Sequence, residues 1–207
     1  MLIKVCGMRN LKNIKEVAEL RPDLMGFIFY NKSKRFVGDD FDYNIIHSLN
    51  PSIATVGVFV NEILENLKNK IKLYKFDYVQ LHGTESPNYC GEIRKESKVL
   101  KSFGIRDKFD WSSLNPYTEV CDYFLFDTST KDYGGSGIKF NWKYLDNYHI
   151  RKPFFLSGGI GLEDADEIKN LDNPFIAGID INSRFESEPG LKKIELLDTF
   201  INQILLL

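Results

Sequence analysis

The sequence predicts an α/β protein that folds as a single (β/α)8 TIM barrel over residues 1–207. Short apolar runs alternate with longer amphipathic stretches along the whole chain. About eight such pairs, each roughly 25 residues long, suit a compact barrel better than an open sheet of about five or six strands. An open doubly wound sheet is the main alternative, because one miscounted strand would be enough to confuse the two.

The predicted strands are segments rich in bulky apolar, β-branched and aromatic residues. They are Leu2–Cys6, Leu24–Tyr30, Ile53–Val60, Asp77–Leu81, Val99–Phe103, Tyr123–Asp127, Pro153–Leu156 and Phe175–Ile181. No proline- or serine-rich linker divides the chain, so we expect one domain.

Between these strands, apolar residues recur with the helical period of about 3.6 residues. The pattern begins at Leu11 and at Ile63, and a closing helix is predicted from Leu191 to Ile201. Ser86-Pro87 is a typical helix start, since Ser caps a helix and Pro suits its first position. Gly161–Asp164 is a second predicted helix start.

The composition is that of an ordinary globular protein, with 43% hydrophobic and 27% charged residues and a net charge of -2. Because the basic residues form no concentrated block, we expect no nucleic-acid partner. No apolar run is long enough to span a bilayer, and the first residues, Met1–Lys4, reach a charge too soon for a signal peptide. We therefore expect no membrane partner and a cytoplasmic location.

The cysteines and histidines predict no metal site. Cys6, Cys90 and Cys121 cannot all pair within the chain and have no C-x-x-C spacing. The three histidines lie far apart and lack the spacing of metal ligands.

Asp127 ends a predicted buried strand, and a loop of small, polar and glycine residues follows it. In a parallel sheet this end of the strands is where ligands bind. Asp127 is therefore a candidate acid, base or ligand-binding residue. The alternative is that it only caps the next turn.

Cys6 ends the first predicted strand, so its thiol is expected at the same end of the sheet as Asp127. Gly7 permits close approach of a ligand, and the dipole of the following helix can favour a thiolate. An isolated buried cysteine is most often a small hydrophobic residue, which is how we interpret Cys90 and Cys121.

Three further loops on this rim carry candidate binding residues. The basic loop 31–36 contains Arg35, and Arg can clamp a carboxylate with two parallel hydrogen bonds, although a solvated charge run is the simpler interpretation. The glycine turn at Gly158-Gly159 and the segment from Asp180 through Ser183 follow the last two strands, where barrels often bind phosphate. Neither segment fits a nucleotide-binding motif, so we expect no nucleotide cofactor. His82 ends the fourth strand, and its role is left open.

Taken together, these motifs resemble the phosphoribosylanthranilate isomerase family, in order and over nearly the whole chain. The segments that carry the resemblance are Lys4–Met8, Lys32–Arg35, Gly57–Asn61, Val79–Gly83, Phe126-Asp127, Gly134–Gly137, Leu156–Gly159 and Asp180–Glu186.

The resemblance implies a (β/α)8 barrel without metal or organic cofactor. It implies the Amadori rearrangement of N-(5-phosphoribosyl)anthranilate to 1-(2-carboxyphenylamino)-1-deoxyribulose 5-phosphate, a step of tryptophan biosynthesis. The general base of the family falls on Cys6, its general acid on Asp127 and its contact to the substrate carboxylate on Arg35.

The remaining substrate contacts expected from the resemblance are Gly158, Gly159, Asp180 and Ser183, with the phosphate bound at the glycine turn and Ser183. Residues 182–184 read Asn-Ser-Arg, where some members of the family have two serines and Gly. We expect a monomer or a homodimer. The rival interpretations are another enzyme that acts on sugar phosphates and a phosphosugar-binding barrel without activity, and intact Cys6 and Asp127 argue against the latter.

Overall fold

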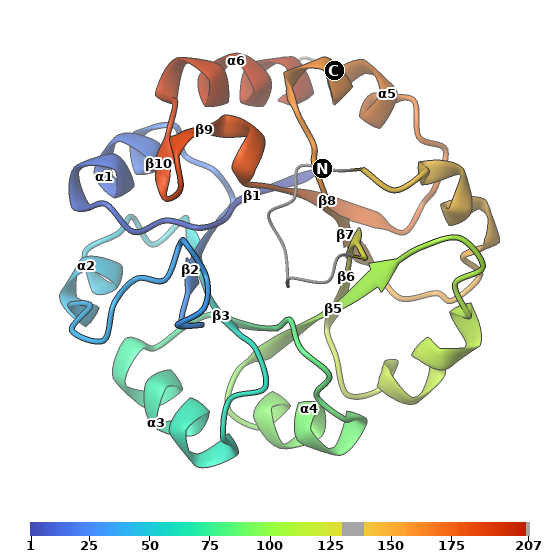
Figure 1. The fold of residues 1–207 in the computed structure, drawn as a ribbon, viewed down its shortest axis with the longest axis horizontal. Helices are drawn as coiled ribbons and strands as arrows, with labels where there is room; N and C mark the ends of the chain where they lie inside the picture. Colours follow the sequence, from blue (N-terminus) through green and yellow to red (C-terminus); the bar gives the residue numbers. More distant parts are fainter. Residues whose placement is uncertain (130–138, 206–207) are drawn as a thin grey trace.

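The strands β1 to β8 form a closed parallel barrel in chain order, with the helices on its outside (Figure 1). The computed structural model describes residues 1–129 and 139–205. The first and last strands of the barrel pair with each other, and Lys4 stands opposite Asp180 in that pairing. The predicted barrel is therefore confirmed. The alternative of an open sheet is wrong, because an open sheet has two unpaired edge strands, whereas β1 and β8 pair with each other here.

Every predicted strand is present, with ends that differ by a few residues at most. The strands are β1 (Leu2–Val5), β2 (Leu24–Ile28), β3 (Ala54–Phe59), β4 (Tyr78–Leu81), β5 (Lys98–Ile105), β6 (Tyr123–Thr128), β7 (Phe154–Leu156) and β8 (Ile176–Ile181). Asp127 is therefore the penultimate residue of its strand, and Cys6 directly follows its own.

The helices after the first four strands and after the last two are α-helices in whole or in part. They are α1 (Leu11–Glu19), α2 (Tyr43–His47), α3 (Leu64–Tyr74), α4 (Pro87–Arg94), α5 (Ala165–Lys169) and α6 (Ile194–Leu205). Short 3₁₀ helices add to them: η1 (Trp111–Tyr117) after β5, η2 (Trp142–Asn147) after β6, η3 (Leu162–Asp164) before α5 and η4 (Ser183–Phe185) after β8.

Both predicted helix starts are confirmed by their hydrogen bonds. The Ser86 hydroxyl accepts from the backbone N–H of Tyr89 at 3.3 Å, and Pro87 occupies the first position of α4. At η3, the Asp164 carboxylate accepts from the backbone N–H of Gly161 at 2.8 Å.

The closing helix begins later than predicted. Leu191-Lys192 form the strand β10, which pairs with β9 (Glu186–Glu188), and α6 starts only at Ile194. The Asn13 side chain on α1 accepts from the backbone N–H of Lys192 at 2.7 Å and donates to its carbonyl at 3.0 Å. Because the backbone N–H and carbonyl of Lys192 bond to Asn13, they cannot form helical hydrogen bonds. The prediction that the closing helix starts at Leu191 is therefore wrong.

The apolar core has two parts. The larger part fills the space between the strands and the outer helices. The smaller part fills the inside of the barrel, with side chains from Leu24, Val56, Val58, Leu100, Leu125 and Phe155. Near the carboxyl ends of the strands, the mouth of the barrel, this interior turns polar. Among residues 1–129 and 139–205, no helix combines the length and the apolar character needed to cross a membrane.

Candidate active site

Cys6 lies at the mouth of the barrel, directly after β1, and the residue is only 4% exposed. Its neighbour Gly7 has φ +77°, in the left-handed region that favours glycine. A Cβ on Gly7 would lie 2.6 Å from Asn182 Oδ1 and 2.7 Å from Arg35 Cδ. The missing side chain lets the loops after β2 and β8 pack against the backbone beside Cys6.

Asp127 is held from two sides. Its Oδ1 accepts a hydrogen bond from the backbone N–H of Thr128 at 2.7 Å, and its Oδ2 lies 3.5 Å from His82 Nε2. The other ring nitrogen of His82 lies 2.9 Å from the amide nitrogen of Gln80. With that amide as donor, a neutral imidazole carries its proton on Nε2, facing Asp127. His82, whose role the sequence leaves open, therefore stands beside the predicted acid.

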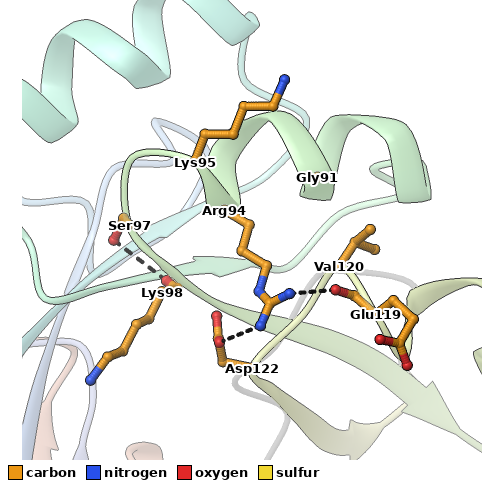
Figure 2. Close-up of a pocket in the computed structure, with 8 residues that line it drawn as sticks. All are labelled: Gly91, Arg94, Lys95, Ser97, Lys98, Glu119, Val120 and Asp122. Carbon is orange, nitrogen blue, oxygen red and sulfur yellow. Dashed lines mark hydrogen bonds and ion pairs between the residues drawn. The ribbon is translucent and has the colours of Figure 1, made fainter.

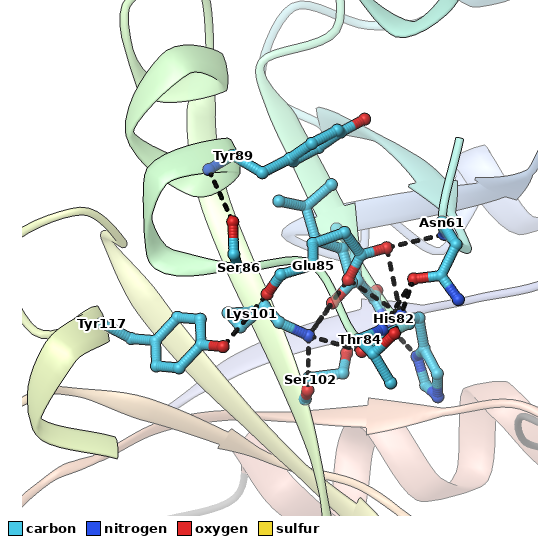
Figure 3. Close-up of polar contacts among 12 residues, drawn as sticks. Asn61, His82, Thr84, Glu85, Ser86, Tyr89, Lys101, Ser102 and Tyr117 are labelled. Carbon is cyan, nitrogen blue, oxygen red and sulfur yellow. Dashed lines mark hydrogen bonds and ion pairs between the residues drawn. The ribbon is translucent and has the colours of Figure 1, made fainter. Parts of the chain in front are cut away.

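A buried ion pair holds the loop that carries His82 (Figure 3). Lys101 Nζ lies 3.1 Å from Glu85 Oε2, and the two side chains are 3% and 2% exposed. Lys101 also donates to the carbonyl of Gly83 at 2.8 Å, and Glu85 accepts from the backbone N–H of Asn61 at 2.8 Å. The loop after β4 is thereby tied to β5 and to the loop after β3, which fixes the position of His82.

A cavity of about 350 Å³ opens beside Asp127, between the loops after β4, β5 and β6. Phe103, Arg106 and Phe109 line it together with His82. Aromatic rings beside a guanidinium suit a planar group that carries negative charge.

Arg35 lies on the other side of the mouth and is paired with a carboxylate of the chain itself. Its Nε and Nη2 donate to Glu186 Oε2 at 2.9 and 2.6 Å. Lys192 donates to the second oxygen of Glu186 at 2.6 Å. Burial opposes the charge on Glu186, but the hydrogen bonds from Arg35 and Lys192 outweigh it and lower the pKa of the carboxyl.

The glycine turn after β7 approaches Asp127 closely. Gly158 and Gly159 have φ +93° and +67°, and a Cβ on Gly158 would lie 2.8 Å from Asp127 Oδ1. Within residues 1–129 and 139–205, no hydrogen bond uses the backbone N–H of either glycine. Among the described residues, these two donors have no partner.

Ser183 begins η4 in the loop after β8, and the described hydrogen bonds leave its backbone N–H unused as well. The next residue, Arg184, forms an exposed ion pair with Glu163 of η3. This pair joins the loops after β7 and β8, so the donors of the two loops border one region of the mouth.

Asp180 lies below these loops, inside the barrel, and both of its oxygens have partners in the chain. Oδ1 accepts from Lys4 Nζ at 2.7 Å, and Oδ2 accepts from the Ser157 hydroxyl at 3.1 Å. Lys4 is fully buried. Burial works against its charge, yet the Asp180 carboxylate raises the pKa of Lys4 above its ordinary value, so Lys4 stays protonated.

Burial raises the pKa of the Cys6 thiol, and the Lys4 ammonium opposes this shift. In the part of the chain that the structure describes, no three His, Cys, Asp or Glu side chains are grouped to hold a metal ion.

The hollow in Figure 2 lies at the other end of the barrel, near the amino ends of β5 and β6. There Arg94 donates to the carbonyl of Glu119 at 2.5 Å and to Asp122 at 3.2 Å. Active sites of (β/α)8 barrels lie at the carboxyl ends of the strands, so this hollow is separate from the candidate site.

The family model for N-(5'phosphoribosyl)anthranilate (PRA) isomerase matches residues 3–203. The chain belongs to this family. It is 49% identical to an N-(5'-phosphoribosyl)anthranilate isomerase from Parabacteroides distasonis, over 99% of this chain and 94% of that one. A relative from Phocaeicola vulgatus with the same name is 42% identical, over 99% of this chain and 98% of its own.

Solved structures of PRA isomerases have the same fold. The enzyme from Thermotoga maritima superimposes with a TM-score of 0.88 at 33% identity, over 99% of this chain and 98% of that one. A PRA isomerase in complex with reduced 1-(o-carboxyphenylamino)-1-deoxyribulose 5-phosphate superimposes with a TM-score of 0.85 at 30% identity, over the same shares of the two chains.

All candidate residues of this PRA isomerase family member lie at the mouth of the barrel or just inside it. Cys6 and Asp180 come together through Lys4, and Asp127 and Gly158 are in near contact. Arg35 reaches Glu186 rather than open solvent. The motif Gly134–Gly137 lies outside the described residues.

The polar residues of the site that were not predicted as functional include Lys4, Gln80, Glu186 and Lys192. A lysine or glutamine inside an apolar strand is a signal for a buried polar role, since such residues are rarely buried without a partner. Glu186 and Lys192 lie in β9 and β10, and nothing in their local sequence indicates that Glu186 pairs with both Lys192 and Arg35.

Proposed function

We propose that this chain converts N-(5'-phosphoribosyl)anthranilate into 1-(2-carboxyphenylamino)-1-deoxyribulose 5-phosphate, with Asp127 as general acid and Cys6 as general base. The chain is an isomerase of tryptophan biosynthesis, and its membership of the PRA isomerase family is the observation that supports this reaction. The position of both residues at the mouth of one barrel supports their roles.

The reaction needs one proton delivered and one removed. Asp127 protonates the ring oxygen of the ribose as the C1–O bond breaks, which leaves an iminium ion at C1. The Cys6 thiolate then removes the proton from C2, and the electron pair of that bond neutralises the iminium to give an enolamine. The enolamine tautomerises to the ketone, so substrate and product are isomers.

Arg35 is proposed to contact the anthranilate carboxylate. Its described side-chain hydrogen bonds use Nε and Nη2 for Glu186, which leaves Nη1 to reach the substrate. The ion pair with Glu186 fixes the guanidinium plane, so the contact is held at a defined place.

The phosphate is proposed to bind the backbone N–H groups of Gly158, Gly159 and Ser183. These donors are unused among the described hydrogen bonds, and backbone N–H groups at such turns bind anions. Direct contact between Asp180 and the substrate stays a prediction, since both of its oxygens already have partners within the chain.

Loss of substrate fluorescence on addition of the purified protein tests the activity, and mass analysis of the product tests the rearrangement. Cys6→Ser and Asp127→Asn are each expected to prevent most of this loss of fluorescence. Unchanged fluorescence with the parent protein would contradict the proposed reaction.

We further propose one domain over residues 1–207, a cytoplasmic location, and action as a monomer or a homodimer. Pairing of β1 with β8 supports the single domain, because the barrel needs both ends of the chain. One solved relative, from Thermotoga maritima, is described as dimeric. Light scattering of the purified chain measures the number of copies.

A further inference from the structure

We propose that Lys4 is a positioning residue that stabilises the thiolate of Cys6 through its buried ammonium group, which Asp180 anchors. The inference rests on the proposed role of Cys6 as the base. It concerns how a buried thiol can lose its proton near neutral pH.

The pairing of the strands places these groups together. Lys4 and Asp180 are opposite each other on β1 and β8, so their side chains point to the same side of the sheet, the inside of the barrel. Cys6 follows Lys4 by two residues and also points inward. The ammonium, which is bonded to the Asp180 carboxylate, therefore lies on the same side of the sheet as the thiol.

Gly26 on β2 provides the space in which the two groups meet. A Cβ on Gly26 would lie 2.8 Å from Cys6 Sγ and 3.2 Å from Lys4 Nζ. Sulfur and ammonium thus border the same small volume, within the distance of about 6 Å at which an opposite charge favours ionisation.

Asp180 fixes the direction of the ammonium. The hydrogen bond from Lys4 Nζ to Asp180 Oδ1 is 2.7 Å long, and the Ser157 hydroxyl holds the other carboxylate oxygen at 3.1 Å. Lys4 is fully buried and Asp180 is 7% exposed, so water screens this arrangement little.

The other charged groups near Cys6 are accounted for. Lys192 of β10 also favours the thiolate, and Asp180 disfavours it. Lys192 forms an ion pair with Glu186, and Glu186 also pairs with Arg35. The positive charge of Lys192 is therefore offset by the Glu186 carboxylate. Lys4 opposes the effect of burial on Cys6 more strongly than Lys192 does.

The test measures the thiolate without turnover. The rate of Cys6 alkylation by iodoacetamide is followed against pH in the folded protein, and peptide mass spectrometry separates Cys6 from Cys90 and Cys121. The double variant Lys4→Met/Asp180→Asn removes the ammonium and leaves no unpaired carboxylate. We expect its alkylation midpoint to rise by about one to three pH units, with at least a roughly tenfold slower reaction at pH 7.

A matched control is the double variant Lys101→Met/Glu85→Gln, which removes a second buried ion pair elsewhere in the barrel. This control shows whether a loss of stability alone makes Cys6 more accessible to iodoacetamide. The pH midpoint of its Cys6 alkylation is expected to equal that of the parent. Lys4→Arg keeps the charge and is expected to keep the midpoint of the parent.

Gly26→Ala gives an independent variant if the double variant does not fold. It keeps both charges, but its Cβ separates the sulfur from the ammonium, so the midpoint should rise. An unchanged midpoint in either variant overturns the proposal. A raised midpoint with full turnover would support the coupling of Lys4 to Cys6. The same result would contradict the role of Cys6 as the base, because turnover would then not depend on the Cys6 thiolate.

Discussion

His82 faces Asp127 across the mouth of the barrel, with Nε2 3.5 Å from Oδ2 of the carboxyl group. The ring is oriented from behind by Gln80, whose amide also donates to the Ser102 hydroxyl at 3.1 Å. Gln80 of β4 and Ser102 of β5 therefore help to hold His82 where it faces the carboxyl group of β6.

Replacing His82 tests this orientation. His82→Asn removes the contact to Oδ2, and we expect kcat to fall by roughly tenfold, the scale of one polar contact worth about 1.4 kcal/mol. Binding of the reduced product analogue, measured by calorimetry, should stay the same. His47→Asn is the control, because His47 contacts the carbonyl of Tyr74 on the outer layer. An equal loss in both variants would rule out a specific role.

Asp127→Asn keeps the shape of the side chain but cannot deliver a proton. Turnover should fall by about 10²–10⁴-fold, as is typical for a lost general acid. The reduced, acyclic analogue needs no ring opening, so its affinity should change little in calorimetry. Lost binding with full turnover at saturation would make Asp127 a substrate anchor instead.

The pH dependence of turnover should follow the thiol of Cys6. Because burial raises the pKa of Cys6, its thiolate fraction grows as the pH increases through and above neutrality. We expect kcat/KM to increase over about pH 6 to 9, where thiols ionise. Iodoacetamide should abolish the activity, and the product analogue should slow this loss. A flat profile, or full turnover after alkylation of Cys6, would contradict the base assignment.

Glu186→Gln is expected to lower the free energy of unfolding at pH 7 by about 3–5 kcal/mol, because it leaves Arg35 and Lys192 buried without their carboxylate. The pKa of Glu186 is lowered on folding, so this stabilisation is present above the unfolded pKa of about 4.3 and is lost as the pH falls below it. Urea titrations at neutral and acid pH measure the difference. The exposed Glu188→Gln is the control, and a difference that does not shrink in acid would contradict the assignment.

A sulfate or phosphate ion should bind at Gly158, Gly159 and Ser183. Gly158→Ala adds a Cβ at 2.8 Å from Asp127 Oδ1, at φ +93°, and should raise KM by about tenfold or more. Gly38→Ala is the matched control, because Gly38 has φ +105° with no atom within 4 Å of the added Cβ. Crystals soaked in sulfate locate the ion. Anion density only at residues 32–35 would contradict this prediction and would assign the phosphate site to the loop after β2.

The order of strands was predictable because each buried strand is a continuous apolar run between amphipathic segments. The positions of Cys6 and Asp127 at the mouth of the barrel could be predicted for the same reason, since each ends such a run. The shift of the last helix to Ile194 was not predictable, because the side chain that bonds the backbone of Lys192 belongs to Asn13, far away in the sequence.

The partners of the site residues were also hidden from the sequence. Arg35 meets Glu186 and Lys4 meets Asp180 only after the barrel closes, and no local pattern records such pairs. His82 could be placed at a strand end, but its distance from Asp127 depends on how β4 and β6 are set around the barrel.

Closure of the barrel through β1 and β8 also sets the order in which the site can form during synthesis. Lys4 and Asp180 are 176 residues apart in the chain, so the first strand leaves the ribosome long before its partner exists. Synthesis at about 5–20 residues per second gives that strand several seconds or more with an open edge and a lysine without its carboxylate. The strand that leads into Cys6 is therefore among the first to be made and the last to be enclosed, and until residues 176–181 emerge it depends on β2 alone for a paired edge.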